Sequence, residues 1–240
     1  MQRADLYLTE NGYYESRARA QAAIRAGLVK VDGKRLKKAS EKLSELNEIQ
    51  AKTEHPWVSR GGLKLAYALK EFNVNPQGKT CLDVGASTGG FSDVLRQNGA
   101  AKIYAVDVGH GQLHASLQNV PEITSMEGQD ARDLTAAHFS PKPQLVVCDA
   151  SFISCMKVLE TPLTLTSTSA DLITLVKPQF EVGKTGIKRG GLVKSESLAL
   201  QALSDVSAWV TQKGWHVVAT CKSPIKGGSG NTEYLLHARR

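Results

Sequence analysis

The sequence predicts an α/β protein with an open, mostly parallel sheet, preceded by a small α+β domain. Short apolar stretches predict the sheet, because each has the length and composition of a buried strand and ends in a charged residue. They are Lys102–Asp107, Leu145–Asp149 and Leu172–Lys177. A further stretch, Thr80–Val84, runs directly into a glycine-rich segment, which predicts a sharp turn from a strand into a helix. Charged residues at such strand ends face the ligand crevice of an open parallel sheet.

The glycine-rich segment after Val84 indicates a nucleotide-type ligand. Glycines let the backbone approach a ligand at a helix N-terminus, and an acid at the end of the next strand, here Asp107, can hold ribose hydroxyls. The segment lacks both the GxGxxG spacing of dinucleotide sites and the lysine of a P-loop. An adenosyl group without phosphates, as in S-adenosylmethionine, therefore fits better, and a plain strand-to-helix turn is the alternative. The predicted cofactor-binding residues are Asp83, Gly85, Ser87, Thr88, Gly89, Gly90, Phe91, Asp107 and Asp130.

Asp130 enters that set as a partner for an adenine amino group, and a surface turn explains it equally well. His110 and His114 stand four apart, but Gly109 and Gly111 weaken the helix that would bring them to one metal. We therefore expect no bound metal.

The composition indicates a globular protein with a polyanionic partner. Apolar residues make up 41% of the 240 residues, and 30 Lys and Arg against 23 Asp and Glu give a net charge of +7. Residues 1–60 carry 12 of the basic and 8 of the acidic residues, so the first quarter of the chain holds more than half of the excess. No signal segment or membrane-spanning run is visible, and the four cysteines form no CxxC pair. We expect a cytoplasmic protein with reduced thiols and no membrane partner, and the sequence does not indicate an oligomeric state.

The first fifty residues predict two short helices followed by a β-hairpin. Helix-forming residues fill Arg3–Asn11, and Ser16 can cap a second helix that Gly27 ends. The alternation in Val29–Val31 and the pair Asp32-Gly33 then predict a strand and a primed hairpin turn. Basic side chains surround this unit, which suits phosphate binding. A merely solvated basic face is the alternative.

This unit resembles the αL, or S-four, RNA-binding domain. The resemblance rests on Arg3-Ala4-Asp5-x-x-Leu8, Ser16-Arg17-x-x-Ala20 and Ile24-x-x-Gly27-x-Val29-x-Val31-x-Gly33. It implies an RNA-binding domain over residues 1–52, and Pro56 marks residues 53–60 as a linker to a second domain over 61–240. The predicted RNA-binding residues, two of them in the second domain, are Arg3, Arg17, Arg19, Arg25, Lys30, Lys34, Arg35, Lys188 and Arg189.

The second domain opens with a predicted helix over Gly61–Phe72, and its Lys64 lies near the N-terminus. A cation there opposes the helix dipole and is unfavourable unless an anion faces it. Farther along, Gln179–Ser195 is glycine-rich, basic and too long for an ordinary connection, so we expect a flexible lid whose Lys188 and Arg189 meet RNA phosphates. A helix and two strands are predicted at Ser197–Lys213, Trp215–Cys221 and Thr232–Ala238.

Five motifs of the second domain resemble the TlyA family, historically labelled hemolysin A. They are Ser59-Arg60-Gly61-Gly62-Leu63-Lys64-Leu65, Asp83-Val84-Gly85, Cys148-Asp149-Ala150-Ser151-Phe152, Leu175-Val176-Lys177-Pro178-Gln179-Phe180-Glu181 and Asn231-Thr232-Glu233-Tyr234. The resemblance covers nearly the whole chain. It implies a Rossmann-like class I S-adenosylmethionine-dependent methyltransferase of the FtsJ type, with a mostly parallel seven-stranded sheet. It also implies 2′-O-methylation of cytidine in ribosomal RNA, on naked RNA or a ribosomal subunit.

The Lys-Asp-Lys-Glu tetrad of FtsJ-like enzymes maps onto Lys64, Asp149, Lys177 and Glu233. A ribose 2′-hydroxyl is a very weak acid, so its attack on a sulfonium methyl group is helped by a base and by positioning. A lysine must be neutral to act as that base, and burial and a second ammonium nearby favour the neutral form. We predict that Lys177 is the base and that the other three residues support it. An interdomain salt-bridge network is the alternative.

Other activities fit the sequence less well. An NAD-type oxidoreductase would need the missing GxGxxG, and a pore-forming hemolysin would need membrane-active segments. Methylation of an exocyclic amine is not indicated, because no Asn-Pro-Pro-aromatic motif is present. Methylation at C5 would need a cysteine nucleophile, and Cys148 is expected to point into the core. A non-catalytic RNA-binding factor is opposed by the complete tetrad. The chain begins almost directly at the RNA-binding motif, as the shorter family members do, which argues against activity on the small ribosomal subunit.

Overall fold

The computed structural model describes residues 1–14, 16–52 and 55–240. The chain divides into two compact units, Met1–Pro56 and Trp57–Arg240, each with its own hydrophobic core. The division falls within the predicted linker, whose residues 53 and 54 lie outside the described residues. Among the residues that are described, no helix combines the length and the apolar character needed to cross a membrane.

The first unit packs two helices against short strands around a core that includes Leu8, Ile24 and Val29. Strands β3, β2 and β5 form one sheet, and β1 pairs with β4. Its elements are β1 (Gln2–Arg3), α1 (Ala4–Glu10), α2 (Arg17–Ala26), β2 (Val29–Val31), β3 (Lys34–Arg35), β4 (Lys42–Leu43) and β5 (Ile49–Ala51).

Local chemistry sets the ends of these elements as the sequence predicts. The Ser16 hydroxyl accepts a hydrogen bond from the Arg19 amide, and Gly27 ends α2 at a φ of 77°. Asp32 and Gly33 both have positive φ, 49° and 76°, so the turn between β2 and β3 is of the primed type. The predicted hairpin is confirmed.

The second unit is built on a seven-stranded sheet with the order β11-β12-β10-β9-β6-β7-β8. Strand β12 pairs antiparallel with both β10 and β11, whereas β10, β9, β6, β7 and β8 pair in parallel. The strands are β6 (Thr80–Val84), β7 (Lys102–Asp107), β8 (Ile123–Glu127), β9 (Leu145–Cys148), β10 (Asp171–Val176), β11 (His216–Lys222) and β12 (Tyr234–Arg239). The helices are α3 (Gly61–Glu71), α4 (Gly90–Gln97), α5 (Cys155–Leu159), α6 (Pro178–Glu181) and α7 (Glu196–Gln212), with five short 3-10 turns.

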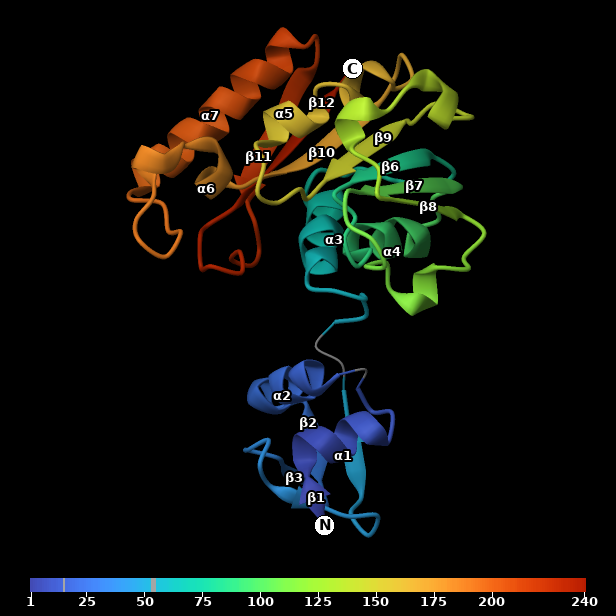
Figure 1. Ribbon diagram of the computed structural model, residues 1–240, viewed down its shortest axis with the longest axis vertical. Coiled ribbons are helices and arrows are strands. Elements are labelled where there is room, and N and C mark those ends of the chain that lie inside the picture. Colours follow the sequence, from blue (N-terminus) through green and yellow to red (C-terminus); the bar gives the residue numbers. More distant parts are fainter. Residues whose placement is uncertain (15, 53–54) are drawn as a thin grey trace. The chain divides into compact units, whose positions relative to one another are not determined.

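Helices cover both faces of this sheet (Figure 1). Leu145 and Val147 of β9 pack on the side of α3 and α4, whereas Val146 and Cys148 pack on the side of α5 and α7. Because both faces are buried, the central strands read as continuous apolar runs rather than as alternating ones. Cys148 points into the core, as expected.

Several elements differ from the prediction. Strands β1, β4, β5 and β8 and helix α5 were not predicted. In β8 only Ile123 is buried, and the other residues are half-buried or exposed at the edge of the sheet, so no apolar run indicates a strand. The segment expected to be a flexible lid is not a plain loop. It contains the end of α6, a 3-10 turn over Lys184–Gly186 and a bridge between Ile187 and Val193.

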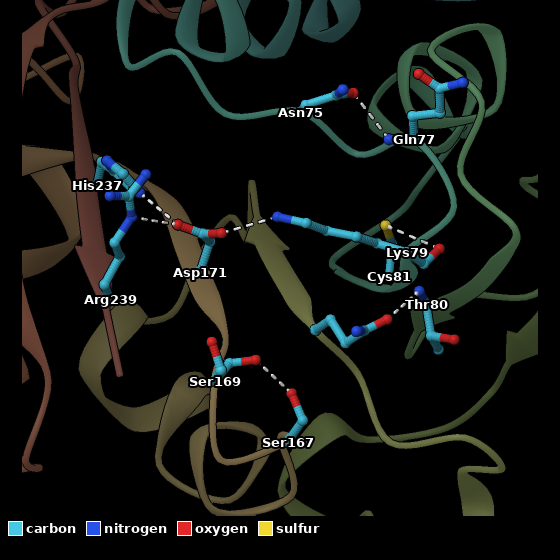
Figure 2. Close-up of polar contacts among 11 residues, drawn as sticks. Asn75, Gln77, Lys79, Thr80, Cys81, Ser167, Ser169, Asp171, His237 and Arg239 are labelled. Carbon is cyan, nitrogen blue, oxygen red and sulfur yellow. Dashed lines mark hydrogen bonds and ion pairs between the residues drawn. The ribbon is translucent and has the colours of Figure 1, made fainter.

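An ion-pair cluster joins three strands at the end of the sheet where β6 and β10 begin (Figure 2). Asp171 accepts hydrogen bonds from Lys79 Nζ at 2.9 Å and from Arg239 Nε at 3.0 Å, and it lies 2.9 Å from His237 Nε2. Burial alone would raise the pKa of Asp171, but these partners outweigh it and hold the pKa below its ordinary value. The cluster ties β10 to β12 and to the residue that precedes β6.

Candidate active site

The four residues of the predicted tetrad lie together at the carboxyl end of the parallel strands. Lys64 Nζ is 2.7 Å from Glu233 Oε2 and 3.7 Å from Asp149 Oδ2, and Lys177 Nζ is 2.7 Å from Asp149 Oδ1. The charges therefore alternate in the order Glu233, Lys64, Asp149, Lys177. Both lysines are less than a tenth exposed and Glu233 is 2% exposed. Two cations and two anions thus sit close together with little water around them.

Each tetrad residue is delivered by a different element. Lys64 lies in the first turn of α3, and Glu233 and Asp149 are the anions that this position requires. Asp149 directly follows β9, Lys177 follows β10 and Glu233 precedes the antiparallel β12, so all three stand at one edge of the sheet. Lys177 Nζ also donates to the Asp149 carbonyl at 3.1 Å and to Ser151 Oγ at 2.7 Å. These bonds fix the direction of the Lys177 side chain.

The tetrad opens into a cavity of about 380 Å³, and a second cavity of about 550 Å³ adjoins it. Gly85, Ser87, Asp149, Ser151 and Phe152 line both. The larger volume falls within the roughly 300–1,000 Å³ of small-molecule sites. The smaller cavity therefore holds the tetrad and most of the glycine turn, and the larger one extends from Gly85 and Ser87 to Asp107 and Asp130.

The three glycine positions of the turn after β6 have no room for a side chain. A Cβ at Gly85, where φ is +80°, would come within 2.9 Å of the Ala150 backbone, and one at Gly89 would overlap Leu117. A Cβ at Gly90 would overlap the Ser59 hydroxyl, so α4 can begin close to the segment that leads into α3. Thr88 and the buried Phe91 line the tetrad cavity beside this turn. The glycines thus let the backbone of this turn pack closely on its neighbours and line the cavity wall.

Asp107, the predicted ribose-binding acid, ends β7 and lines the larger cavity. Its two carboxylate oxygens accept hydrogen bonds from the Ser87 amide at 2.8 Å and the Gly109 amide at 2.7 Å. Each carboxylate oxygen has a second lone pair, so the group retains acceptor capacity for ribose hydroxyls. The structure brings Asp107 and the glycine turn together across adjacent strands.

Asp83 lines neither of the two cavities. It is fully buried in β6, and Ser92 Oγ donates to its Oδ2 at 2.7 Å, whereas its Oδ1 has no hydrogen-bond partner among the described residues. Burial raises the pKa of Asp83 to about 7, with a smaller contribution from the negative charges of Asp149 and Asp107. Its contact with a cofactor stays a prediction, because the side chain lies beneath the glycine turn rather than on its surface.

Asp130 lines the larger cavity but already has a partner. Arg132 approaches its carboxylate through Nη2 at 2.6 Å and Nε at 3.0 Å, and the Arg132 amide donates to Oδ1 at 2.9 Å. The hydrogen bond from the Arg132 side chain holds the pKa of Asp130 below its ordinary value. An adenine amino group would share this carboxylate with Arg132, so the predicted adenine contact stays a prediction.

The predicted RNA-binding residues differ in how they are held. Arg3 and Arg17 pair with the buried Asp5, which also accepts from Gln21, while their own side chains remain 40% and 51% exposed. Arg35 donates to the Arg25 carbonyl at 3.1 Å. Arg25, Lys30, Lys34, Arg35, Lys188 and Arg189 are exposed, and Arg19 is half-buried. Their contact with RNA stays a prediction.

Sequence reasoning missed several residues of the site. Phe152 is 92% exposed at the boundary of the two cavities, with a φ of 66° that is rare for a bulky residue, and its ring lies 5.5 Å from that of Phe180. Ser151 bonds to Lys177, and Arg132 pairs with Asp130. All three stand within three residues of a predicted site residue, so inspecting the neighbours of each motif acid would have found them.

The described residues contain no cluster of three or more histidine, cysteine or acidic side chains that could hold a metal ion. Three of the four cysteines are buried and all four are free thiols.

Comparison with known proteins identifies both units. A sequence profile of the family described as FtsJ-like methyltransferase matches residues 57–240, and a profile of the S4 domain matches residues 2–49. The chain is 42% identical over 239 residues to the 16S/23S rRNA (cytidine-2'-O)-methyltransferase TlyA of Mycobacterium tuberculosis, covering 99% of this chain and 89% of that protein. It is 38% identical over 236 residues to Hemolysin A of Brachyspira hyodysenteriae, covering 98% of each.

A solved structure from Streptococcus thermophilus, described as a candidate hemolysin, superposes with a TM-score of 0.78 at 37% identity and covers 100% of this chain and 88% of that one. The predicted fold is confirmed, as is the resemblance that the motifs indicate. The chain belongs to the TlyA family, in which an S4 domain precedes an FtsJ-like methyltransferase domain.

Proposed function

We propose that this chain transfers a methyl group from S-adenosylmethionine to the 2′-hydroxyl of a cytidine in ribosomal RNA. The observation that carries the proposal is the alternating row of Glu233, Lys64, Asp149 and Lys177 beside the glycine turn. The named activity of the Mycobacterium tuberculosis relative supplies the substrate class. Ribosomal RNA as partner in turn supports a cytoplasmic location.

The cavities fit the proposed cofactor. The glycine turn, most of which lines the smaller cavity, would hold its methionine part, and Asp107 in the larger cavity would hold its ribose hydroxyls. S-adenosylmethionine would supply a methyl group bonded to a positively charged sulfur, and this charge makes the methyl carbon electrophilic enough for a weak oxygen nucleophile. The carboxylates of Asp107 and Asp149 lie along this cavity and offset that charge.

The tetrad prepares the ribose oxygen. In the transfer, the ribose oxygen would take the methyl group as its bond to sulfur breaks, leaving S-adenosylhomocysteine, and the hydroxyl proton would pass to Lys177 Nζ in its neutral form. Ser151 and the Asp149 carbonyl aim this amine into the cavity, while Glu233 and Asp149 hold Lys64 at its side. Positioning of the hydroxyl between the two amines contributes to the rate together with proton transfer.

The RNA-binding side chains of both units would hold the substrate through its phosphates. We assign this role to Arg3, Arg17, Arg19, Arg25, Lys30, Lys34, Arg35, Lys188 and Arg189. In this proposal residues 1–52 form the RNA-binding domain, 53–60 the linker and 61–240 the catalytic domain.

The test incubates purified protein with methyl-labelled S-adenosylmethionine and ribosomal RNA from cells that lack the gene, and identifies the labelled nucleoside after digestion. We expect 2′-O-methylcytidine. Label on a base, or no label, contradicts the proposal. Calorimetric titrations with NAD and with S-adenosylmethionine, run side by side, separate a methyltransferase from an oxidoreductase on the same fold.

The names of two relatives suggest haemolysis as a second candidate activity. Purified protein added to red cells tests it directly. Haemolysis that persists in a Lys177→Met variant would identify an activity independent of the tetrad, whereas intact cells leave methyl transfer as the activity of this chain.

A further inference from the structure

A basic hairpin lies close to the tetrad in the fold although the sequence separates them. Ile187 and Val193 form an antiparallel bridge, and the Lys188 amide donates to the Leu192 carbonyl at 2.7 Å. The hairpin closes through a hydrogen bond from the Gly191 amide to the Lys188 carbonyl at 3.0 Å. Lys188 and Arg189 are exposed at its tip. The hairpin therefore presents two cations on a short, closed backbone.

Asn231 joins this hairpin to the turn before Glu233. Its Oδ1 accepts from the Val193 amide at 3.0 Å and its Nδ2 donates to the Gly191 carbonyl at 2.9 Å. The side chain is 5% exposed, and it satisfies one backbone donor and one backbone acceptor, as a neighbouring strand would. An aliphatic replacement would leave both backbone groups without these partners.

The same turn holds the Glu233 carboxylate in place. The Gly227 amide donates to the Asn231 carbonyl at 3.0 Å and the Gly230 amide to the Gly227 carbonyl at 2.8 Å, which closes the turn. A Cβ added at Gly227 would overlap Glu233 Oε1, so this carboxylate rests directly against the Gly227 backbone. Its other oxygen contacts Lys64. The carboxylate is thus fixed between Lys64 and the turn that Asn231 closes.

We propose that Asn231 is a positioning residue that couples the basic hairpin to the tetrad. When RNA phosphates engage Lys188 and Arg189, the hairpin is held against Asn231, and the turn keeps the Glu233 carboxylate aligned with Lys64. This inference rests on the proposed methyl transfer to RNA. It adds that RNA binding by the hairpin accelerates the methyl-transfer step itself, beyond any effect on the affinity for RNA.

The first test measures single-turnover methyl transfer at saturating RNA and cofactor. Asn231→Ala should lower this rate roughly 10- to 100-fold, the loss expected from a misplacement near 1 Å, while affinity for S-adenosylmethionine stays within about twofold. Asn98→Ala is the matched control, because it also removes an amide-to-carbonyl bond, to Val94 at the end of α4, and it should keep the rate.

A double-mutant cycle isolates the coupling. In the otherwise unaltered protein, Lys188→Ala with Arg189→Ala should lower the rate at saturating RNA by about tenfold, and in the Asn231→Ala background by less than about twofold. Independent effects that multiply overturn the inference, because they show that the hairpin and Asn231 act separately. A rate that Asn231→Ala leaves unchanged overturns it as well.

Gly227→Ala tests the placement of the Glu233 carboxylate without a substitution at Asn231. We expect a loss of up to about 100-fold in the transfer rate, because the new methyl group displaces the Glu233 carboxylate. A transfer rate that Gly227→Ala leaves unchanged overturns the inference. An unaltered protein that transfers no methyl group to RNA overturns the proposed function and this inference together.

Discussion

Two charged clusters lie at opposite ends of the same pair of strands, β10 and β12. At one end, Lys177 follows β10 and Glu233 precedes β12, and both belong to the tetrad. At the other end, Asp171 begins β10 and pairs with His237 and Arg239 of β12 (Figure 2). Both clusters contain pairs shorter than 3 Å, so the lengths of the ion pairs do not distinguish them.

The surroundings of the two clusters do distinguish them. The tetrad residues line a cavity beside the glycine turn, whereas the residues around Asp171 line neither of the two cavities described above. The tetrad also follows an alternating order of two cations and two anions, while Asp171 is a single anion shared by several donors. Paired charges in this fold therefore indicate function only where they meet a cavity. The Asp171 cluster is best explained as a group of structural ion pairs that hold strands of the sheet together.

Replacing one lysine in each cluster is the strongest test of the difference between the two clusters. Lys177→Met should lower methyl transfer by roughly 10²–10⁴-fold, the usual contribution of a general base, with cofactor affinity retained. Lys79→Met removes an ion pair of 2.9 Å from the other cluster, against 2.7 Å for the pair of Lys177, and should keep transfer within about twofold. Steady-state rates and cofactor titrations of both variants check this. Retained turnover in Lys177→Met would refute the assigned role.

Asp171→Asn should have the opposite effects from Lys177→Met: it should lower the stability of the fold and leave methyl transfer unchanged. The variant leaves three donors with a neutral acceptor, so we expect a loss of about 3 kcal/mol in the free energy of unfolding at pH 7. Because the folded pKa of Asp171 lies below its unfolded value, this contribution is present above about pH 3.8 and disappears as the pH falls further. Denaturant melts at pH 7 and pH 3 measure it.

The exposed pair of Lys213 and Glu160 supplies the control for that variant. Glu160→Gln should change stability by less than about 0.5 kcal/mol. If the two variants lose the same stability, the Asp171 cluster is no more than a surface ion pair.

Asp83 should show the opposite pH dependence. Its folded pKa, raised to about 7, means that its contribution to stability is complete below about pH 3.8 and is lost as the pH rises through 7. Relative to the unaltered protein, Asp83→Asn should therefore gain roughly 2–3 kcal/mol between pH 5 and pH 8. Thermal or denaturant melts across this range test it. A parallel pH profile for the two proteins would mean that Asp83 titrates normally.

The smallest expected effect concerns the backbone beside the cavity. Phe152 has a φ of 66°, which costs an ordinary residue about 1–2 kcal/mol and glycine nothing, so Phe152→Gly should stabilise the fold by roughly 0.5–1 kcal/mol after the entropy cost of glycine. Loss of the exposed ring should lower methyl transfer at the same time. Higher stability with unchanged transfer would remove Phe152 from the site.

The sequence predicted the active end of the sheet better than the other end. Lys64, Asp149, Lys177 and Glu233 each stand in a recognisable motif, and the strands that carry them are continuous apolar runs. The partners of Asp171 lie 66 and 68 residues away in an ordinary strand, and no local pattern indicates that they meet. The link from Asn231 to Val193 was missed for the same reason. Pairings across antiparallel β12 depend on register, which only the folded chain shows.

The most direct test maps ribose methylation in ribosomal RNA from cells that lack the gene and carry one of three versions of this chain. If the cavity marks the catalytic end, the unaltered chain and Lys79→Met restore 2′-O-methylcytidine and Lys177→Met does not. Restoration by Lys177→Met, or failure of the unaltered chain, would contradict the assignment of the tetrad as a methyl-transfer site.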